Sequence, residues 1–339
     1  MTLTRDQVAV KAMRGIQSDK AARVKFEEVR VSAKVRVSIF ILSPNLQQLG
    51  KLVLQWQELH HPNVIHCIGL TMQFGPIPAL IFPMCAEGSI MQYIEKNPSA
   101  NKIQLVNYFE QIIYCCLTHR PVKLAQVAGG FNYLHHHGIV HADIRGVSTE
   151  IQLIQVHVDA EMSFQSNILI RDDGTPQIMD AGLSLIVSRA DFTNASVCGP
   201  CRWMPPEVLE PSDDLEYDIV ADSDTDNIFP FSLQSDVYSL GMTILEVLTG
   251  KAPYHHRRYD TVVILDIIHG TPPPRPAKEV MPDGVWTMLH HCWKALPECR
   301  PQVRGVELWL DLIWKTEETR TLYKLQVTQP ETSFTYMPT

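Results

Sequence analysis

Residues 138–146, Gly-Ile-Val-His-Ala-Asp-Ile-Arg-Gly, decide the fold that this sequence predicts. They follow a long apolar pattern of helical period over residues 105–134 and begin a new, non-helical segment. Two short apolar runs come next, residues 167–170 and 177–179, with the turn Asp172-Asp173-Gly174 between them, which is the pattern of a β-hairpin. The middle of the chain therefore places a loop that carries an Asp and an Arg between a helix and a hairpin.

The segments on the two sides of this region differ in kind. Upstream, a helical apolar stripe covers residues 52–59, and short strand patterns occupy residues 7–13, 64–71 and 79–83. Downstream of Asp236 the pattern becomes helical, over residues 237–248, 261–269, 284–294 and 303–314. We therefore expect an α+β fold of two lobes, in which a small β-rich lobe precedes a larger helical lobe.

Composition narrows the class of protein. The 339 residues are 45% hydrophobic, which is enough material for a buried core. The formal net charge of −8 argues against nucleic acid or an anionic membrane surface as a partner. No apolar run approaches the roughly 18–20 residues that span a bilayer. We expect a soluble, cytoplasmic protein with no nucleic acid or membrane partner, and composition leaves its oligomeric state open.

The cysteines offer one alternative function. Cys198-Gly-Pro-Cys201 has the spacing of a thioredoxin-type redox motif, but that chemistry requires the first Cys at the N-terminus of a helix that directly follows a strand. Polar residues 188–196 precede this motif, and Pro205-Pro206 follows it. A redox function is therefore the weakest alternative. A zinc site is no better supported, because no second Cys or His pair lies at ligand spacing.

Six motifs, in the right order, resemble those of eukaryotic protein kinases. Val8-Ala9-Val10-Lys11 resembles the strand that carries the family's lysine, His141–Gly146 the catalytic loop, and Asp180-Ala181-Gly182 the Asp-Phe-Gly motif. The other three motifs are Pro205-Pro206-Glu207, Ser235–Gly241, and Cys292-Trp293 with Arg300-Pro301. Each motif is weak alone, but the ordered set covers about residues 7–315. Together with Arg202-Trp203-Met204, it is most similar to the tyrosine-kinase-like group, notably its expanded fungal families.

The resemblance implies a bilobal protein-kinase-like fold and phosphoryl transfer from ATP, with Mg²⁺, to Ser, Thr or Tyr hydroxyls of a protein substrate. Lys11 would hold the nucleotide phosphates, and Asp143 would orient the substrate hydroxyl and accept its proton. Arg145 would lie near the transferring phosphate. Asp180 and Asn167 would bind the metal.

Further positions follow from the same resemblance. The adenine would hydrogen-bond the backbone of the hinge at Pro83–Cys85, with Phe82 at the back of the pocket. Glu207 and Arg300 would form a structural ion pair. Ala181 stands where the family has Phe, which removes an aromatic side chain between the lobes. Ala142 replaces an Arg, so control by phosphorylation of the activation segment is doubtful.

The resemblance divides the chain into a partial N-terminal lobe (1–82), a C-terminal lobe (83–320) and a polar tail (321–339). The glycine-rich loop that would cover the phosphates is absent, because the sequence begins inside the strand that bears Lys11. Residues 212–229 would form an acidic, solvated loop.

Three segments interrupt the family pattern, at about residues 29–52, 109–125 and 147–165. The last of them separates Asp143 from Asn167 by 24 positions instead of five, and its removal restores the string D-I-R-G-S-N-I-L-I. We interpret the three segments as translated introns, with genuine surface loops as the alternative.

The carboxylate partner of Lys11 depends on this interpretation. Counting back from His61 without a gap puts Leu52 at its place, and leucine cannot pair with a lysine. If residues 29–52 are an insertion, Glu28 comes into register, and we favour Glu28.

Two functions therefore stay open. Lys11, Asp143, Asp180 and Asn167 together favour an active protein kinase. The missing phosphate-covering loop and the interrupted catalytic loop favour a pseudokinase that acts as a binding or scaffold module. The preference for Ser/Thr or Tyr also stays open.

Overall fold

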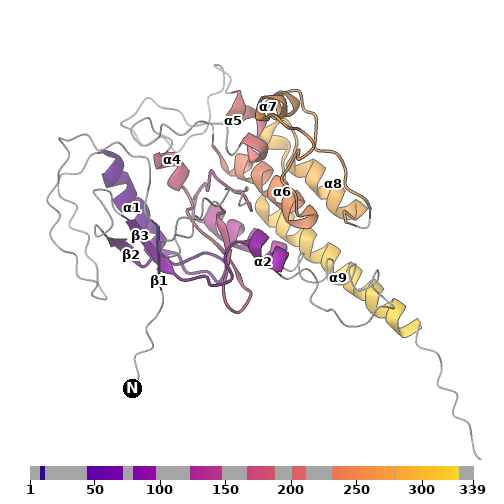
Figure 1. Ribbon diagram of the computed structural model, residues 1–339, viewed down its shortest axis with the longest axis horizontal. Coiled ribbons are helices and arrows are strands. Elements are labelled where there is room, and N and C mark those ends of the chain that lie inside the picture. The colour runs from indigo at the N-terminus through magenta and orange to yellow at the C-terminus, as the bar shows by residue number, and fades with distance from the viewer. Residues whose placement is uncertain are drawn as a thin grey trace, which may run out of the picture.

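The computed structural model describes residues 8–11, 44–71, 79–96, 123–146, 166–187, 201–210, 231–278 and 280–327. All statements about structure refer to these residues. Figure 1 shows two parts: α1 and the strands β1–β3 lie on the left, and most of the helices, coloured orange and yellow, lie on the right. This arrangement confirms the expected α+β fold of a small, sheet-containing lobe and a larger helical lobe.

A three-stranded antiparallel sheet carries Lys11. Its strands are β1 (Val8–Lys11), β2 (Gly69–Thr71) and β3 (Ala79–Pro83), in the order β1-β3-β2, and Lys11 lies opposite Leu80. β3 has the predicted bounds, whereas β2 is shorter than the strand expected over residues 64–71. The reason is a long-range pairing: Val64 forms a parallel bridge with Ile178, and the Ile65 N–H donates to the Ile178 carbonyl at 2.8 Å.

Helix α1 (Pro44–Glu58) is longer than the expected helix over residues 52–59. It begins at a proline, which is favoured in the first turn because that position needs no N–H donor. Residues 44–52, which the sequence analysis assigned to an insertion, are thus part of this helix. Leu49, Leu52, Val53 and Trp56 are buried and follow helical spacing, so they form the face that packs against the core. Residues 29–43 lie outside the described residues.

Helix α6 (Leu233–Thr249) forms the centre of the large lobe. Ser232 and Ser235 form a capping box at its start, and Gly250 ends it in the left-handed conformation with a φ of 71°. The helices packed around it in this lobe include α8 (Asp283–Cys292), α7 (Asp260–Ile268) and a helix over residues 123–136. The remaining short helical elements are α2 (Ile90–Lys96), α4 (Leu183–Val187), α5 (Pro206–Leu209), η1 (Cys201–Trp203) and η2 (Pro297–Cys299).

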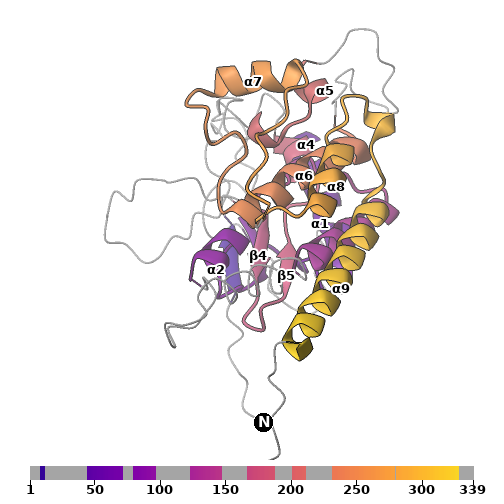
Figure 2. The ribbon, with the colours of Figure 1, turned by 90° about the vertical axis from the view of Figure 1, so that its right-hand side faces the viewer.

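The predicted hairpin is present as β4 (Ile168–Ile170) and β5 (Pro176–Ile178), with Ile168 opposite Ile178. Figure 2 shows it beside α2, which contacts β4. Both strands are buried, so the residues that follow β5 and precede β4 are held firmly.

Helix α9 (Val303–Val327) continues past the expected end at residue 314 and into the polar tail expected from residue 321. Figure 1 shows its last turns extending away from the body of the molecule. The expected insertions lie outside the described residues over 109–122 and 147–165, as does the acidic loop at 212–229, whereas residues 123–125 belong to the helix over residues 123–136.

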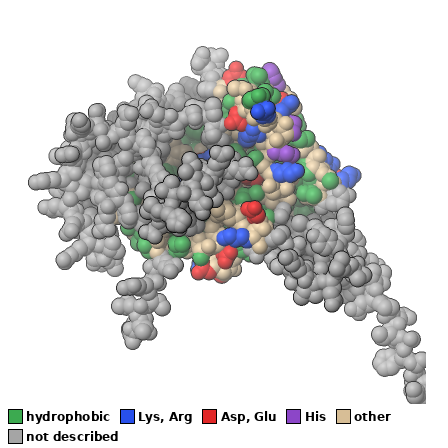
Figure 3. Space-filling model, viewed as in Figure 1, with side chains coloured by type: hydrophobic (Ala, Val, Ile, Leu, Met, Phe, Trp, Pro, Cys, Tyr) green, Lys and Arg blue, Asp and Glu red, His purple; other side chains and the backbone are tan. Residues whose placement is uncertain are grey.

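Surface and helix character bear on possible partners. Within the described part of the chain, no helix combines the length and the apolar character that crossing a membrane requires. On the face shown in Figure 3, the described surface carries basic, acidic and hydrophobic side chains next to one another, without separation by charge.

Candidate active site

The loop 138–146 is held by one buried carboxylate on α6. Asp236 Oδ2 accepts a hydrogen bond from the backbone N–H of His141 at 2.7 Å, and Oδ1 accepts one from Ala142 at 2.9 Å. His135 Nε2 lies 3.0 Å from Oδ2. A third support comes from Thr243, about two turns further along α6, whose hydroxyl donates to the Ile144 carbonyl at 3.2 Å. The helix thus fixes the backbone on both sides of Asp143.

His141 connects this loop to the end of β5. Its Nε2 lies 2.9 Å from the Met179 carbonyl, and its Nδ1 accepts a hydrogen bond from the Asp143 N–H at 3.2 Å. The ring is fully buried, so both of its nitrogens are occupied by backbone groups. The position of Asp143 is therefore tied to the position of Asp180, which directly follows Met179.

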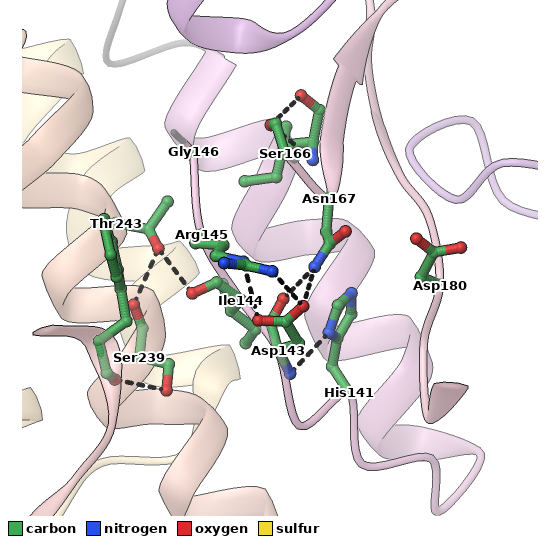
Figure 4. A network of polar contacts seen from close by, with 12 residues as sticks. His141, Asp143, Ile144, Arg145, Gly146, Ser166, Asn167, Asp180, Ser239 and Thr243 are labelled. Carbon is green, nitrogen blue, oxygen red and sulfur yellow. Dashed lines mark hydrogen bonds and ion pairs between the residues drawn. The ribbon is translucent and has the colours of Figure 1, made fainter. Parts of the chain in front are cut away.

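Asp143, Arg145 and Asn167 form one cluster, which Figure 4 shows with the Asp143 carboxylate at its centre. Arg145 Nε lies 3.0 Å from Asp143 Oδ1, and its Nη2 donates to Oδ2 at 3.2 Å. Asn167 Nδ2 donates to the same Oδ2 at 2.8 Å. Although Asp143 and Asn167 are 24 positions apart in the sequence, the fold brings their side chains into direct contact. The carboxylate is partly exposed, so a substrate can reach it.

Lys11 and Asp180 form an ion pair between the two lobes. Asp180 is 5% exposed and has a φ of 65°, a left-handed conformation that is uncommon for residues other than glycine. Hydrogen bonds hold this conformation: the Leu183 N–H donates to the Asp180 carbonyl at 3.0 Å, and the Gly182 N–H donates to the His141 carbonyl at 3.1 Å. The sequence prediction that these two residues meet therefore agrees with the geometry.

The residues around Asp180 fit a magnesium ion with a nucleotide. Asp180 Oδ1 is buried and has no hydrogen-bond partner among the described residues, and buried oxygens of this kind normally have one. In Figure 4 the Asn167 amide nitrogen faces Asp143, while its oxygen lies on the side of Asp180. Mg²⁺ prefers oxygen ligands and is usually held by one or two protein groups together with phosphates. No group of three His, Cys, Asp or Glu in the described residues could hold a metal without such phosphates.

The expected partner of Lys11 is not seen. Glu28 lies outside the described residues, and α1 presents Leu52 toward the Asp180-Ala181-Gly182 segment: a Cβ built on Gly182 would lie 3.5 Å from Leu52 Cδ1. The single acidic residue of α1 is Glu58, which is exposed at its C-terminal end. Within the described residues, Asp180 is thus the carboxylate that pairs with Lys11.

Trp56 is a residue of the site that the sequence analysis missed. Its indole Nε1 donates to the Ala181 carbonyl at 2.9 Å, and its ring lies 6.1 Å from the Phe82 ring, centroid to centroid. The indole is buried beside Ala181, the position at which the resemblance predicts a lost aromatic contact. The signal in the sequence was available: Trp56 follows Leu52 by four residues and so lies on the same face of the helix.

Glu246 is a second missed residue. Its Oε2 accepts hydrogen bonds from the Gly146 N–H at 3.0 Å and from the Trp203 indole at 3.1 Å, so it joins the catalytic loop to η1. Burial raises its pKa to about 8, against smaller opposing effects of these two donors and of Arg145.

The hinge residues lie at the end of β3. Phe82 and Cys85 are buried, and burial raises the pKa of the Cys85 thiol to about 11. Pro83 has no N–H, so a donor to an adenine ring must come from Met84 or Cys85. Contact of a nucleotide with Pro83 and Cys85 stays a prediction.

Two remaining expectations concern residues outside the cleft. Arg300 and Glu207 form the expected ion pair, buried and bidentate, with Nη1–Oε1 and Nη2–Oε2 distances of 2.6 and 2.7 Å. The weakest alternative was a redox function of Cys198 and Cys201. Cys198 lies outside the described residues, and Cys201 is buried at the start of η1.

Comparison with known proteins finds protein kinases among the relatives of this chain. The chain is 27% identical over 256 residues to mitogen-activated protein kinase kinase kinase 12 of Rattus norvegicus, and 26% identical over 256 residues to kinase kinase kinase 13-A of Xenopus laevis. These matches cover 76% of this chain, but only 23% and 21% of those relatives. A tyrosine-protein kinase receptor, TYRO3 of Danio rerio, is 23% identical over 84% of this chain and 28% of its own length. The chain thus spans less than a third of each of these relatives.

The family model described as protein tyrosine and serine/threonine kinase matches residues 43–149 and 156–310. The match is interrupted inside the segment 147–165, which the sequence analysis marked as extra. It covers more than half of the chain and includes Asp143, Asn167 and Asp180. This chain belongs to the protein tyrosine and serine/threonine kinase family.

Proposed function

We propose that this kinase domain binds ATP and Mg²⁺ between Lys11 and Asp180 and transfers the γ-phosphate to a hydroxyl group of a protein bound at Asp143. The meeting of Lys11 and Asp180 carries the proposal, since these residues are 169 positions apart and come from different lobes. The contact between Asp143, Arg145 and Asn167 at the adjacent loop supports it.

Charge neutralisation is the main requirement of phosphoryl transfer, because the transferring group carries negative charge on its oxygens. Lys11 would turn its ammonium from Asp180 toward the phosphates of the nucleotide. Asp180 Oδ1 and the Asn167 amide oxygen would hold Mg²⁺, which supplies charge neutralisation when it is bound. Before a nucleotide binds, the Lys11–Asp180 ion pair would keep both groups at the cleft.

Asp143 is suited to the hydroxyl group. Its Oδ2 accepts hydrogen bonds from Arg145 and Asn167, and Arg145 Nε lies 3.0 Å from its Oδ1, so these contacts fix the carboxylate plane and leave further lone pairs free. The hydroxyl oxygen forms a bond to the γ-phosphorus, the bond from that phosphorus to the bridging oxygen of ADP breaks, and the hydroxyl proton passes to Asp143. Arg145 would stabilise the charge of the transferring group.

The substrate class is a protein, and the family contains both tyrosine and serine/threonine kinases. The choice between these hydroxyls stays open, as does the identity of the protein substrates. A cytoplasmic location, without nucleic acid or membrane partners, stays a prediction from the sequence.

Two binding and transfer measurements test the proposal. ATP binding is measured by calorimetry with and without Mg²⁺, and phosphate transfer is measured with γ-labelled ATP on a peptide library that offers Ser, Thr and Tyr. Asp180→Asn should abolish the gain in affinity that Mg²⁺ gives. Asp143→Asn should keep nucleotide binding and lower transfer by roughly 100- to 10,000-fold, the usual contribution of a general base.

Asp173→Asn is the matched control. Asp173 lies in the β4–β5 turn and its side chain is 55% exposed, so its replacement should change neither measurement. A wild-type protein that binds no nucleotide at millimolar concentration, or an Asp180→Asn variant that keeps its response to Mg²⁺, would overturn the proposal.

A further inference from the structure

The face of α1 that meets the active site is apolar and aromatic. Leu52 and Trp56 are four residues apart, so they lie one above the other on the helix. Both are buried, and both reach the segment Asp180-Ala181-Gly182: Leu52 packs against Gly182, and Trp56 donates to the Ala181 carbonyl. The helix therefore contacts the metal-binding segment through packing and one hydrogen bond, without a charged side chain.

The Trp56 hydrogen bond has the properties of a fixed contact. An indole N–H can only donate, and when buried it needs an acceptor. Trp56 is 3% exposed and Ala181 is equally buried, so water does not compete for the 2.9 Å bond. The small side chain of Ala181 leaves its carbonyl within reach of the indole. The tilted contact with Phe82 holds the ring from its other side.

The acceptor belongs to a peptide group whose orientation matters for catalysis. The Ala181 carbonyl and the Gly182 N–H belong to one peptide group, and the residues on the two sides of Ala181 both have a positive φ, 65° at Asp180 and 78° at Gly182. Glycine adopts many conformations at little cost, so this backbone is easily rotated unless it is held. The catalytic loop holds it at the Gly182 N–H, and α4 holds the Asp180 carbonyl. Among the described residues, Trp56 provides the backbone contact that comes from the small lobe.

We propose that Trp56 is a positioning residue that orients the Asp180 carboxylate for metal binding. Its indole N–H fixes the Ala181–Gly182 peptide group, one residue beyond Asp180, and so couples the placement of α1 to the placement of the metal ligand. The inference rests on the proposed role of Asp180 in holding Mg²⁺.

The test removes the donor and keeps the ring. In Trp56→Phe the aromatic side chain remains but the N–H is lost. Replacement of Trp56 by 3-benzothienylalanine keeps the full size of the bicyclic ring and removes only the N–H. Trp286→Phe, on α8 in the large lobe, is the control for losing an indole N–H away from Asp180; Trp286 is partly buried, whereas Trp56 is buried.

The readout is the ratio of the ATP dissociation constants measured by calorimetry without and with Mg²⁺. We expect both changes at position 56 to lower this ratio by about two- to ten-fold, the net value of one hydrogen bond, and to leave the metal-free dissociation constant unchanged. Trp286→Phe should change neither constant. In an Asp180→Asn background the substitution of Trp56 should have no further effect, because the two residues then act through the same contact.

The outcomes separate this inference from the proposed function. If Asp180→Asn abolishes the response to Mg²⁺ and the benzothienyl variant keeps the wild-type ratio, Trp56 has only a packing role and the inference is wrong. If Asp180→Asn itself leaves the response unchanged, the metal-binding role of Asp180 fails first. If both dissociation constants rise equally in the variants at position 56, the hydrogen bond supports the nucleotide site as a whole and does not orient Asp180, which also overturns the inference.

Discussion

Glu207 and Glu246 are both buried, but only Glu207 has a cation bound directly to it. Arg300 donates to both oxygens of Glu207. Glu246 accepts two neutral N–H groups on Oε2, and its Oε1 has no hydrogen-bond partner among the described residues. Burial therefore raises the pKa of Glu246 to about 8, which means that the folded protein favours its protonated form at neutral pH.

This raised pKa predicts how stability changes with pH. Folding takes up a proton at Glu246 between its ordinary pKa of 4.5 and about 8, so stability contributed by the protonated form is complete below 4.5 and is lost as the pH rises through 8. Glu246→Gln imitates the protonated form. We expect its unfolding temperature to exceed that of the wild type, by an amount that grows between pH 6 and 8. The corresponding gain in the free energy of unfolding is at most about 5 kcal/mol.

The measurement is thermal unfolding by circular dichroism across that pH range. Glu58→Gln is the control, because Glu58 is exposed on α1 and its replacement should give a difference that does not vary with pH. A Glu246→Gln difference that is constant from pH 6 to 9 would show that Glu246 is already ionised in the folded protein.

At the scale of elements, the catalytic loop is closed across residues 147–165. The Asn167 N–H donates to the Arg145 carbonyl at 3.3 Å. If Gly146 were joined directly to Ser166, Arg145 and Asn167 would be the first and fourth residues of a β-turn. The hydrogen bond between them would then be the one that defines such a turn. The described residues on the two sides of this segment thus already lie as they would in the uninterrupted loop.

We predict that a variant lacking residues 147–165 folds and keeps its affinity for Mg-ATP. Shortening the connection lowers the entropy cost of closing the loop, so the free energy of unfolding should stay equal or rise by roughly 1 kcal/mol. Urea unfolding and calorimetry check both statements. A variant in which the same 19 residues are replaced by a Gly/Ser linker is the control for length, and it should match the wild type.

An unfolded deletion variant would contradict the prediction and would show that the segment contributes contacts of its own. The interpretation as a translated intron has a separate test. Mature transcripts that contain the codons for residues 147–165 would rule it out, whatever the behaviour of the protein.

How far the sequence could predict these elements depends on the range of the contacts that form them. β3, the hairpin and α6 have strong local patterns and lie where they were expected. The strand expected from residue 64 is mostly absent, because Val64 and Ile65 pair with Ile178 in the other lobe. The start of α1 was missed because the prediction looked for a carboxylate that pairs with Lys11. Leu52 cannot pair with a lysine, so residues up to 52 were assigned to an insertion.

The site itself divides in the same way. Asp143, Asn167, Asp180 and Lys11 could be proposed from the sequence because the chemistry expected of them restricts the residue type at each position, and the structure brings them together in pairs. Trp56 and Glu246 act on backbone groups of Ala181 and Gly146. The spacing of Trp56 from Leu52 places it on the same face of α1, but the backbone group that each of these side chains contacts becomes visible only when the distances are known.

At the scale of the whole molecule, one buried apolar cluster extends through both lobes. It includes Leu49 of α1 and Leu80 of β3 in the small lobe, Ile168 between the lobes, and Val306 and Leu310 of α9 in the large lobe. The cleft residues are thus supported by one continuous core. Two domains joined only by a linker would instead each have a core of their own. Trp203 belongs to a separate cluster with Tyr238, Met242 and Tyr254.

This continuity predicts that the two lobes unfold together. A protein labelled with 5-fluorotryptophan offers a reporter in each part: Trp56 in the small lobe, Trp309 on α9, and Trp203 in the separate cluster. Each resonance is assigned by a single Trp→Phe replacement. In a urea titration followed by fluorine NMR, we expect the native signals of Trp56 and Trp309 to disappear at the same urea concentration, because loss of α1 exposes apolar surface of the shared cluster. If the Trp56 signal is lost at lower urea while Trp309 keeps its native signal, the small lobe is an independent unit, and the core contacts between the lobes are too weak to couple them.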